Sequence, residues 1–217
     1  MKKNKLTKKI YIIGAGKLGI LASEIIKRQG KFRIIGFVES DNRKIGKLIN
    51  NIKVFSDGDV FKKNKPSNIN LVIAIGDINK RKKLIKYYTK IKNINFPNII
   101  DPDSHIIYSE TKLGKGCIIS VNATILNNCN LGDFCIVGTS TSILHDTTIG
   151  NNCLIGGQTV IGANAKINND VFIGVGATIP SSSIKIGSTS FICSGSVILR
   201  NVGKNSKMLG NPAKKVI

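Results

Sequence analysis

A six-residue repeat in the second half of the chain constrains the fold more than any other feature. Leu, Ile or Val stands at every sixth position from Ile107 to Ile179, and after a one-residue slip at 182–185 the repeat continues at 186, 192 and 198. A small or β-branched residue stands four positions after each aliphatic one up to position 183, and glycine often follows the aliphatic residue directly. This period predicts a parallel β-helix, in which each hexad forms a short strand and a turn, and three hexads close a triangular coil of about 18 residues.

The repeat also distinguishes an inside and an outside of the predicted coils. The aliphatic residue points into the prism and stacks on its counterparts in neighbouring coils, whereas the small residue fits inside the corner. Because the interior is a packed core, function must lie on the outer faces or between chains. Cys193 could face outward, and an odd number of cysteines without paired spacing argues against a disulfide framework and a zinc site. The other cysteines occupy the small position and are expected to fill the core: Cys117, Cys129, Cys135 and Cys153.

Length and composition indicate two small domains. A chain of 217 residues with 41% hydrophobic content can form two cores, and we place the domains at 1–100 and 101–217. No apolar run approaches the roughly 18 residues of a membrane span, and Lys17 interrupts the only apolar stretch near the N-terminus. We therefore expect neither a membrane span nor a signal peptide, and a cytoplasmic location.

The first domain alternates predicted strands and helices. Strands are expected at 9–13, 32–38 and 70–75, and helices from the turn after the first strand to Gln29 and at 78–90. A strand at 52–55 and a short helix at 57–63 are weaker predictions. The alternation predicts a parallel sheet, so the fold class is α/β plus β: a short Rossmann-like domain followed by a β-helix.

A glycine-rich turn follows the first predicted strand. Its sequence is Gly14-Ala15-Gly16-Lys17-Leu18-Gly19, and such glycines let the backbone place a phosphate against a helix N-terminus. Glu39 follows about 20 residues later, the spacing expected of an acid that binds a ribose hydroxyl. NAD is the obvious ligand, but the domain has room for only half of a dinucleotide fold. A nucleotide sugar fits better, and NAD or a merely tight turn are the alternatives.

Most of the positive charge lies in the first domain. Residues 1–100 contain 24 of the 33 Lys and Arg residues but 6 of the 12 Asp and Glu residues. Only 5 of the basic residues are Arg and 6% of the chain is aromatic, whereas base reading and stacking favour both residue types. We expect no nucleic-acid partner. The charge is either a solvated Lys-rich surface or a positive field that attracts anionic small substrates.

The repeat and the tail Gly210-Asn211-Pro212-Ala213-Lys214 together resemble the left-handed β-helix acyltransferases with hexapeptide repeats. With the glycine-rich first domain and the segment Val72–Asp77 followed by Arg81, the whole chain resembles the sialic-acid O-acetyltransferases and nucleotide-amino-sugar N-acetyltransferases. The resemblance implies acetyl-CoA as co-substrate, no metal, a nucleotide-sugar substrate and a homotrimer with the acetyl-CoA cleft between neighbours.

The resemblance also implies two sets of binding residues. Relatives commonly carry a second histidine where this chain has Leu154, so that contact is lost or replaced. The implied sugar-nucleotide residues are Gly14, Gly16, Lys17, Leu18, Glu39, Ser40, Gly76, Asp77 and Arg81. The implied coenzyme residues are Leu154, Ala163, Val175, Ser194, Asn211, Pro212 and Lys214, with the tail against the adenine end.

His145 is the expected general base. It stands two residues after an inward aliphatic residue and should project from a corner, and in the resembling family a histidine at this place is the base, with a following acid that Asp146 matches. The backbone N–H of Ala163, one coil further, is the candidate donor to the oxyanion. The other histidine, His105, is expected to be structural.

The resemblance thus implies N-acetylation of the 4-amino group of a UDP-type 4-amino-4,6-dideoxy sugar, by direct transfer, for surface glycan biosynthesis. O-acetylation of sialic acid, a non-catalytic nucleotide-sugar-binding scaffold and a purely structural solenoid are the alternatives. The β-helix carbonic anhydrases need three histidines for zinc, and this chain has 2.

Overall fold

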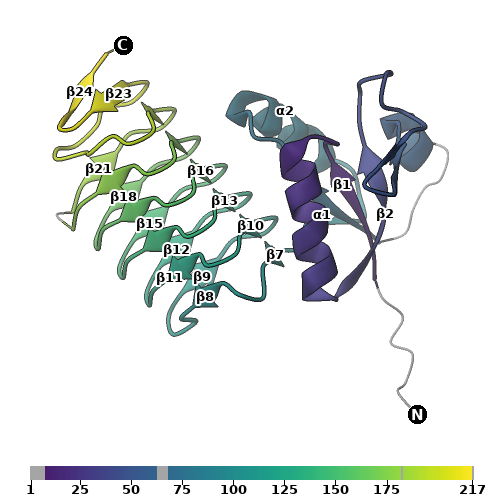
Figure 1. The fold of residues 1–217 in the computed structure, drawn as a ribbon, viewed down its shortest axis with the longest axis horizontal. Coiled ribbons are helices and arrows are strands. Elements are labelled where there is room, and N and C mark those ends of the chain that lie inside the picture. The colour runs from purple at the N-terminus through teal and green to yellow at the C-terminus, as the bar shows by residue number, and fades with distance from the viewer. Residues whose placement is uncertain (1–7, 63–67, 182, 217) are drawn as a thin grey trace. The chain divides into compact units, whose positions relative to one another are not determined.

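The computed structural model describes residues 8–62, 68–181 and 183–216 (Figure 1). The chain forms two compact units, divided between Ile99 and Ile100. Lys63, the predicted end of the short helix, and Ser182, in the predicted slip, lie outside the described residues. No helix within the described ranges is long and apolar enough to cross a membrane.

The first unit is built on a six-stranded sheet in the order β3-β4-β2-β1-β5-β6. All neighbouring strands run parallel except β3 and β4, which form an antiparallel pair. The predicted strands are confirmed with small shifts, whereas β3 and β6 were not predicted. Because β3 runs antiparallel to β4, the sheet is mixed at that edge. The strands are β1 (Lys8–Ile13), β2 (Phe32–Val38), β3 (Leu48–Ile49), β4 (Ile52–Phe55), β5 (Ile69–Ile73) and β6 (Ile94–Asn95).

Three helices connect these strands: α1 (Lys17–Gln29), the π-helical turn η1 (Gly58–Lys62) and α2 (Ile78–Tyr88). α1 packs on β1 and β2 (Figure 1). Gly19 allows this close approach, since a Cβ there would lie 2.0 Å from the Gly14 carbonyl oxygen. The helix ends as predicted at Gly30, which has a φ of 66° and donates its N–H to the Ile26 carbonyl.

The second unit is a parallel β-helix of three sheets. Each strand pairs with strands one coil away, as Ser142 and Ile143 of β14 pair with Val160 and Ile161 of β17. The first sheet contains β7 (Ile99–Ile100), β10 (Ile118–Ile119), β13 (Ile136–Val137), β16 (Leu154–Ile155), β19 (Phe172–Ile173), β22 (Phe191–Ile192), β23 (Lys207–Gly210) and β24 (Ala213–Lys215). The second contains β8 (His105–Ile106), β11 (Thr124–Ile125), β14 (Ser142–Ile143), β17 (Val160–Ile161) and β20 (Thr178–Ile179). The third contains β9 (Lys112–Leu113), β12 (Asn130–Leu131), β15 (Thr148–Ile149), β18 (Lys166–Ile167) and β21 (Lys185–Ile186).

The predicted core is confirmed, and with it the fold class of an α/β unit followed by a left-handed parallel β-helix. Apart from Ile107 and the half-buried Leu113, the predicted inward aliphatic residues are buried, as are the four predicted core cysteines. The small position also makes hydrogen bonds that the sequence analysis did not predict. The Cys153 thiol donates to the Asn168 carbonyl at 3.1 Å, and the Thr141 hydroxyl donates to the Gly156 carbonyl at 2.9 Å. These side chains therefore join one coil to the next.

The six-residue register fails at the N-terminal end of the repeat, and near the C-terminal end it shifts by one residue, as predicted. Ile107, expected to point inward, is 47% exposed, and Ile106 pairs with Ile125 in its place. The first coil therefore contains one residue more than the period allows. After the slip, Ile184 is buried and its carbonyl accepts the Lys166 N–H, so it occupies the inward corner that the period assigned to Ser183.

The corners share a left-handed residue three positions after the inward aliphatic one. Asn128, Asp146 and Asn164 occupy this place at the same corner of three successive coils, with φ of 53°, 60° and 61°. Asn and Asp tolerate this conformation better than other non-glycine residues. Glycine directly after the aliphatic residue is explained by the close spacing of the coils. A Cβ on Gly156 would lie 2.5 Å from the Val175 nitrogen in the next coil.

The C-terminal tail forms a hairpin. β23 and β24 pair antiparallel, with Leu209 opposite Lys214. The hairpin is anchored on the last coil, because Val197 accepts the Ala213 N–H at 2.8 Å and donates its own N–H to the Gly210 carbonyl at 3.0 Å.

Candidate functional site

A cleft of about 710 Å³ lies in the first unit where β1, β2 and β5 end. Ligands of open α/β sheets bind outside the carboxyl ends of the strands, so its position fits a binding site. Of the sugar-nucleotide residues named above, Gly14, Glu39, Ser40 and Asp77 line the cleft. The other lining residues were not predicted from the sequence: Ile13, Val38, Asp57, Ile75, Lys80, Lys83, Leu84, Tyr87 and Tyr88.

The glycine-rich turn leaves the start of α1 open. Gly14 has a φ of +98° and its N–H donates to the Val38 carbonyl at 2.9 Å. Gly16 is the N-cap of α1 and makes no side-chain cap, and the first turn contains no acidic residue. The exposed Lys17 and the half-buried Leu18 begin the helix outside the cleft lining. Such an uncapped N-terminus attracts anions.

Glu39 fixes this turn. One carboxylate oxygen accepts the Ala15 N–H at 3.2 Å, and the other accepts the Ser40 N–H at 2.9 Å. Lys44 lies 3.8 Å from the same carboxylate. A carboxylate oxygen has a second lone pair, so Glu39 can support the turn and still accept a hydroxyl from the cleft.

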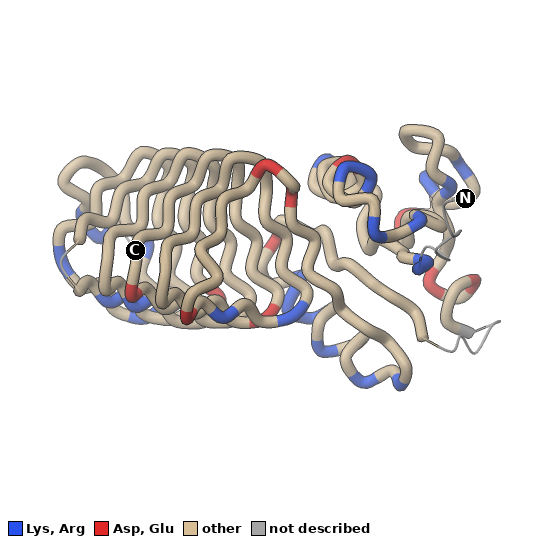
Figure 2. Tube along the Cα trace, turned by 90° about the horizontal axis from the view of Figure 1, so that it is seen from below, with Lys and Arg blue, Asp and Glu red and all other residues tan. Residues whose placement is uncertain are grey.

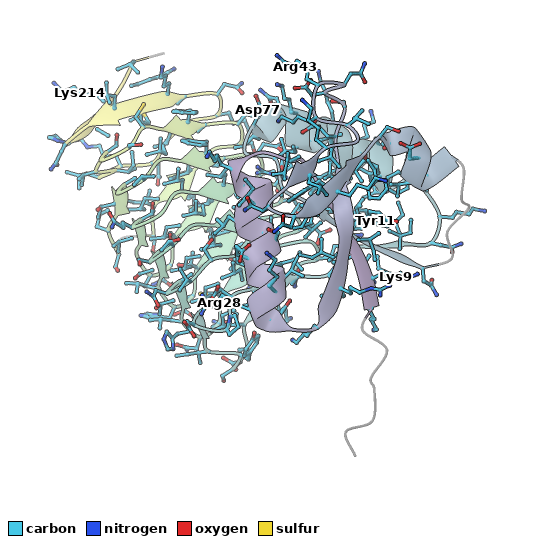
Figure 3. All side chains as sticks on the ribbon, turned by 45° about the vertical axis from the view of Figure 1, so that its right-hand side comes forward. Lys9, Tyr11, Arg28, Arg43, Asp77 and Lys214 are labelled. Carbon is cyan, nitrogen blue, oxygen red and sulfur yellow. The ribbon has the colours of Figure 1, made fainter. Side chains whose placement is uncertain are left out.

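Unlike α1, α2 has an acidic residue at its N-terminus. Asp77 caps α2 by accepting the Lys80 N–H at 2.8 Å (Figure 3), whereas Gly76 is exposed and lies outside the cleft lining. Arg81 is 0% exposed, and its guanidinium donates to the Ile75 carbonyl at 2.8 Å. Arg81 therefore supports the backbone of the turn before α2 from behind rather than reaching the cleft.

Two tyrosines and an acid form one wall of the cleft. The Tyr88 hydroxyl donates to one oxygen of Asp57 at 2.6 Å, and the Tyr87 hydroxyl donates to the other at 3.1 Å. Their rings meet edge to face at 4.9 Å. Burial, followed by the bond to Asp57, raises the pKa of both tyrosines, so both remain phenols that donate. The hydrogen bond to Asp57 and the contact with the Tyr88 ring together hold the exposed Tyr87 ring in one orientation.

His145 lies at the corner between β14 and β15, as expected. Its side chain is 48% exposed, and Nδ1 lies 2.6 Å from Oδ2 of Asp146. Oδ1 of Asp146 accepts the Asn128 amide at 2.5 Å. The hydrogen bonds from His145 and then Asn128 lower the pKa of the Asp146 carboxyl. The ionised carboxylate favours a proton on Nδ1, which leaves the lone pair of His145 on Nε2.

Ala163 lies one coil beyond His145, but its N–H already has a partner. It donates to the Ser181 hydroxyl oxygen at 3.0 Å. The neighbouring Asn164 N–H donates to the His145 carbonyl at 3.1 Å and belongs to the coil-to-coil ladder. To receive an oxyanion, the Ala163 N–H must therefore exchange Ser181 for the reacting oxygen.

The remaining predicted coenzyme residues lie on the first sheet or beside it. Leu154 is on the outer side of β16, in register with Phe172. Val175 is exposed at a corner, and Ser194 occupies the same corner one coil later, because the Gly195 N–H donates to the Val175 carbonyl at 2.9 Å. Ser194 thus keeps the same place in its coil as Val175, on both sides of the slip.

Asn211 and Pro212 form the turn of the terminal hairpin, and Lys214 lies on β24 (Figure 3). His105 lies in β8, far from His145 in sequence and two coils away. The part of the chain that the structure describes contains no group of three or more His, Cys, Asp or Glu residues placed to hold a metal ion.

Two sequence families match parts of the chain. Residues 9–88 match the PglD N-terminal domain, and residues 128–163 and 146–181 match the bacterial transferase hexapeptide (six repeats). A comparison with curated proteins gives no match.

Several solved structures have the same fold. PerB from Caulobacter crescentus, in complex with CoA and GDP-perosamine, has a TM-score of 0.87 and 23% identity over 95% of this chain and 96% of that one. The acetyltransferase domain of PglB from Neisseria gonorrhoeae, in complex with acetyl coenzyme A, has a TM-score of 0.87 and 24% identity over 97% of this chain and 100% of that one. WeeI from Acinetobacter baumannii has a TM-score of 0.67 and 21% identity over 96% of this chain and 100% of that one. Because each match covers almost the whole chain, the solved structures support the fold of the first unit and the fold of the second.

Proposed function

The chain belongs to the hexapeptide-repeat sugar acetyltransferases that carry a PglD N-terminal domain, and from this premise we propose that it acetylates the 4-amino group of a nucleotide-linked amino sugar with acetyl-CoA. The observation that carries the proposal is the His145–Asp146 pair, exposed at a corner of the β-helix with Nε2 available to a substrate. A UDP-linked 4-amino-4,6-dideoxy sugar, used in surface glycan biosynthesis, is the proposed acceptor.

The cleft of the first unit is the proposed nucleotide site. Its volume of about 710 Å³ falls within the usual range for small-molecule sites. The uncapped start of α1 is suited to the diphosphate, Glu39 to a ribose hydroxyl, and the Tyr87 ring to stacking on the base. PerB was solved with a GDP-linked sugar, which supports a nucleotide sugar as the ligand class here.

The proposed reaction is a direct transfer. The amine nitrogen attacks the thioester carbonyl carbon while Nε2 of His145 takes a proton from that nitrogen. The tetrahedral oxyanion accepts the Ala163 N–H, once released from Ser181, and Asp146 stabilises the imidazolium. The C–S bond then breaks, the amide forms, and the coenzyme A thiolate leaves and takes up a proton.

Acetyl-CoA is the proposed co-substrate, and both PerB and PglB were solved with the coenzyme or its acetyl form. We assign Leu154, Val175, Ser194 and the terminal hairpin to its binding. A homotrimer, with the coenzyme between neighbouring chains, is part of the proposal.

The test is release of coenzyme A thiol from acetyl-CoA with UDP- and GDP-linked 4-amino sugars as acceptors. We expect rapid release that His145→Ala reduces by about 100- to 10,000-fold, whereas the matched variant His105→Ala keeps full activity. Equal activity of the two variants would reject His145 as the base.

Other outcomes separate the alternatives. Release only with free sialic acid would establish O-acetylation instead, because that acceptor has no nucleotide. Tight nucleotide-sugar binding without release for any acceptor would establish a binding scaffold.

A further inference from the structure

The carboxylate next to His145 is held from two coils at once. Oδ2 of Asp146 lies 2.6 Å from His145 Nδ1, and Oδ1 accepts the Asn128 side-chain amide at 2.5 Å. Asn128 belongs to the preceding coil and lies 18 positions before Asp146. Each carboxylate oxygen thus has a different partner, and the plane of the carboxylate is fixed by both.

We propose that Asn128 is a positioning residue of the acetyltransferase, an inference that rests on the proposed role of His145. Asn128 orients the Asp146 carboxylate toward Nδ1, and Asp146 in turn holds the imidazole with its lone pair on Nε2. Without Asn128, the Asp146 side chain, which is 39% exposed, is free to rotate into solvent.

The physical reason is the strength and direction of the two hydrogen bonds. Bonds to an ionised acceptor are shorter and stronger than neutral ones, and both distances here are short. The same two bonds lower the pKa of Asp146, which keeps the carboxylate charged. A base that acts at one nitrogen needs this orientation, because small misplacements of a reacting group cost large factors in rate.

An asparagine at a left-handed corner also has a structural role, so the test must separate the two. Asn164 occupies the equivalent position on the other side of Asp146, with φ of 61° against 53° for Asn128. Glycine tolerates this conformation. Asn128→Gly therefore removes the amide without backbone strain, and Asn164→Gly is the matched control for any effect on the corner itself.

The corner segments next to the His145–Asp146 pair are uncharged. The corner segments of the preceding and following coils, residues 126–128 and 162–164, contain no titratable side chain. Besides Asp146, the nearby titratable group is the Cys129 thiol, whose pKa is raised by its burial and, in smaller part, by Asp146. Loss of Asn128 therefore removes no charge from these corners, and its effect on the His145–Asp146 pair comes through the lost hydrogen bond.

The experiment measures both the imidazole and the reaction. The chain has 2 histidines, so nitrogen NMR of the side chains gives two sets of signals, which His105→Ala assigns. In Asn128→Gly we expect the Nδ1-protonated tautomer of His145 to lose population and kcat to fall by about 10- to 100-fold at unchanged KM. Asn164→Gly should change neither.

Identical signals and kcat in the two glycine variants would overturn the positioning role. Failure of the proposed function has a different signature: the wild-type chain would release no coenzyme A thiol with any acceptor, whereas the NMR signals of Asn128→Gly would still decide whether Asn128 orients the pair.

Discussion

Glycines in the first unit serve two different purposes, and their surroundings distinguish them. Gly14 and Gly19 are required by the fold, since a Cβ on Gly14 would lie 2.6 Å from Ile75 and one on Gly19 would lie 2.0 Å from the Gly14 carbonyl. A Cβ on Gly16 or Gly76 would meet nothing within 4 Å. The packing of the chain therefore does not require glycine at Gly16 or Gly76. A ligand that approaches the backbone closely would explain glycine at both positions.

Alanine substitutions test this difference. Gly19→Ala should lower the free energy of unfolding by about 3 kcal/mol, because of overpacking. Gly16→Ala should leave the Tm unchanged but raise the KM for the nucleotide sugar by about tenfold, the equivalent of one lost phosphate contact. Thermal melts and initial rates measure both. An unchanged KM in Gly16→Ala would place the phosphate elsewhere.

Asp146 has a second testable property, its lowered pKa. A depressed folded pKa means that the carboxylate stays charged down to a lower pH, so its contribution is present above the ordinary carboxyl pKa of about 4 and is lost only below it. Any loss of activity between about pH 5 and 7 must then come from another group. Asp146→Asn should lower kcat by at least about tenfold, as part of the general-base contribution, with KM unchanged. A wild-type acidic limb that vanished in Asp146→Asn would contradict this assignment.

The sequence predicted the parts of the site that are close together in the chain. His145 and Asp146 are adjacent, and the glycine-rich turn is a continuous segment, so the repeat and the motif predict their positions, whereas their roles come from the family resemblance. The wall of Asp57 and Tyr88 joins residues 31 positions apart, one just before η1 and one at the end of α2, and no sequence pattern identifies this pair. Nor could spacing show that Arg81 points into the core, because the carbonyl groups of Ile75 and Gly76 that accept its guanidinium are brought into place by the packed turn.

At the scale of the elements, polar residues at the small inward position tie coils together. The Thr159 hydroxyl donates to the Gly174 carbonyl at 3.2 Å in a fully buried corner. Thr159→Val keeps the shape but removes the donor, and we expect a loss of about 1–3 kcal/mol in the free energy of unfolding. Thr178→Val, on the outer side of β20, is the control and should be nearly neutral. Chemical denaturation measures both, and equal stabilities would mean that the hydroxyl only fills space.

The β-helix was the most predictable element because each hexad repeats the same packing requirement. Its failures occur where the repetition ends. Ile106 rather than Ile107 points inward in the first coil, which has no earlier coil of hexads to fix its register, and Ile184 fills a corner only because the slip adds a residue. The hairpin at the C-terminus depends on its anchor at Val197, a contact that the local sequence does not contain.

At the scale of the whole molecule, charge is divided unevenly. Charged residues are sparse along the β-helix coils (Figure 2), where residues 101–217 contain 9 of the 33 basic residues. Within the first unit, Lys80 and Lys83 line the cleft. The remaining excess is either a solvated surface or a field that attracts the anionic substrate.

Ionic strength separates these two interpretations. If the field steers the nucleotide sugar, raising salt from about 0.05 to 0.5 M should lower kcat/KM by about tenfold, because screening shortens the range of the field. The value of kcat at saturation should not change. A kcat/KM independent of salt would show that the charge only solvates the surface.

The proposed trimer makes the two parts of the reaction depend differently on assembly. The residues that line the proposed nucleotide cleft belong to one unit, so we expect a single chain to bind the nucleotide. The coenzyme site is proposed to lie between chains and needs neighbours. We expect a mass of about three times 23.4 kDa in solution. When low urea or dilution dissociates the assembly, acetyl transfer should be lost while UDP binding, measured by calorimetry, persists. A dissociated chain that still transfers acetyl groups would place the whole reaction within one chain, and simultaneous loss of UDP binding would make the cleft itself dependent on the assembly.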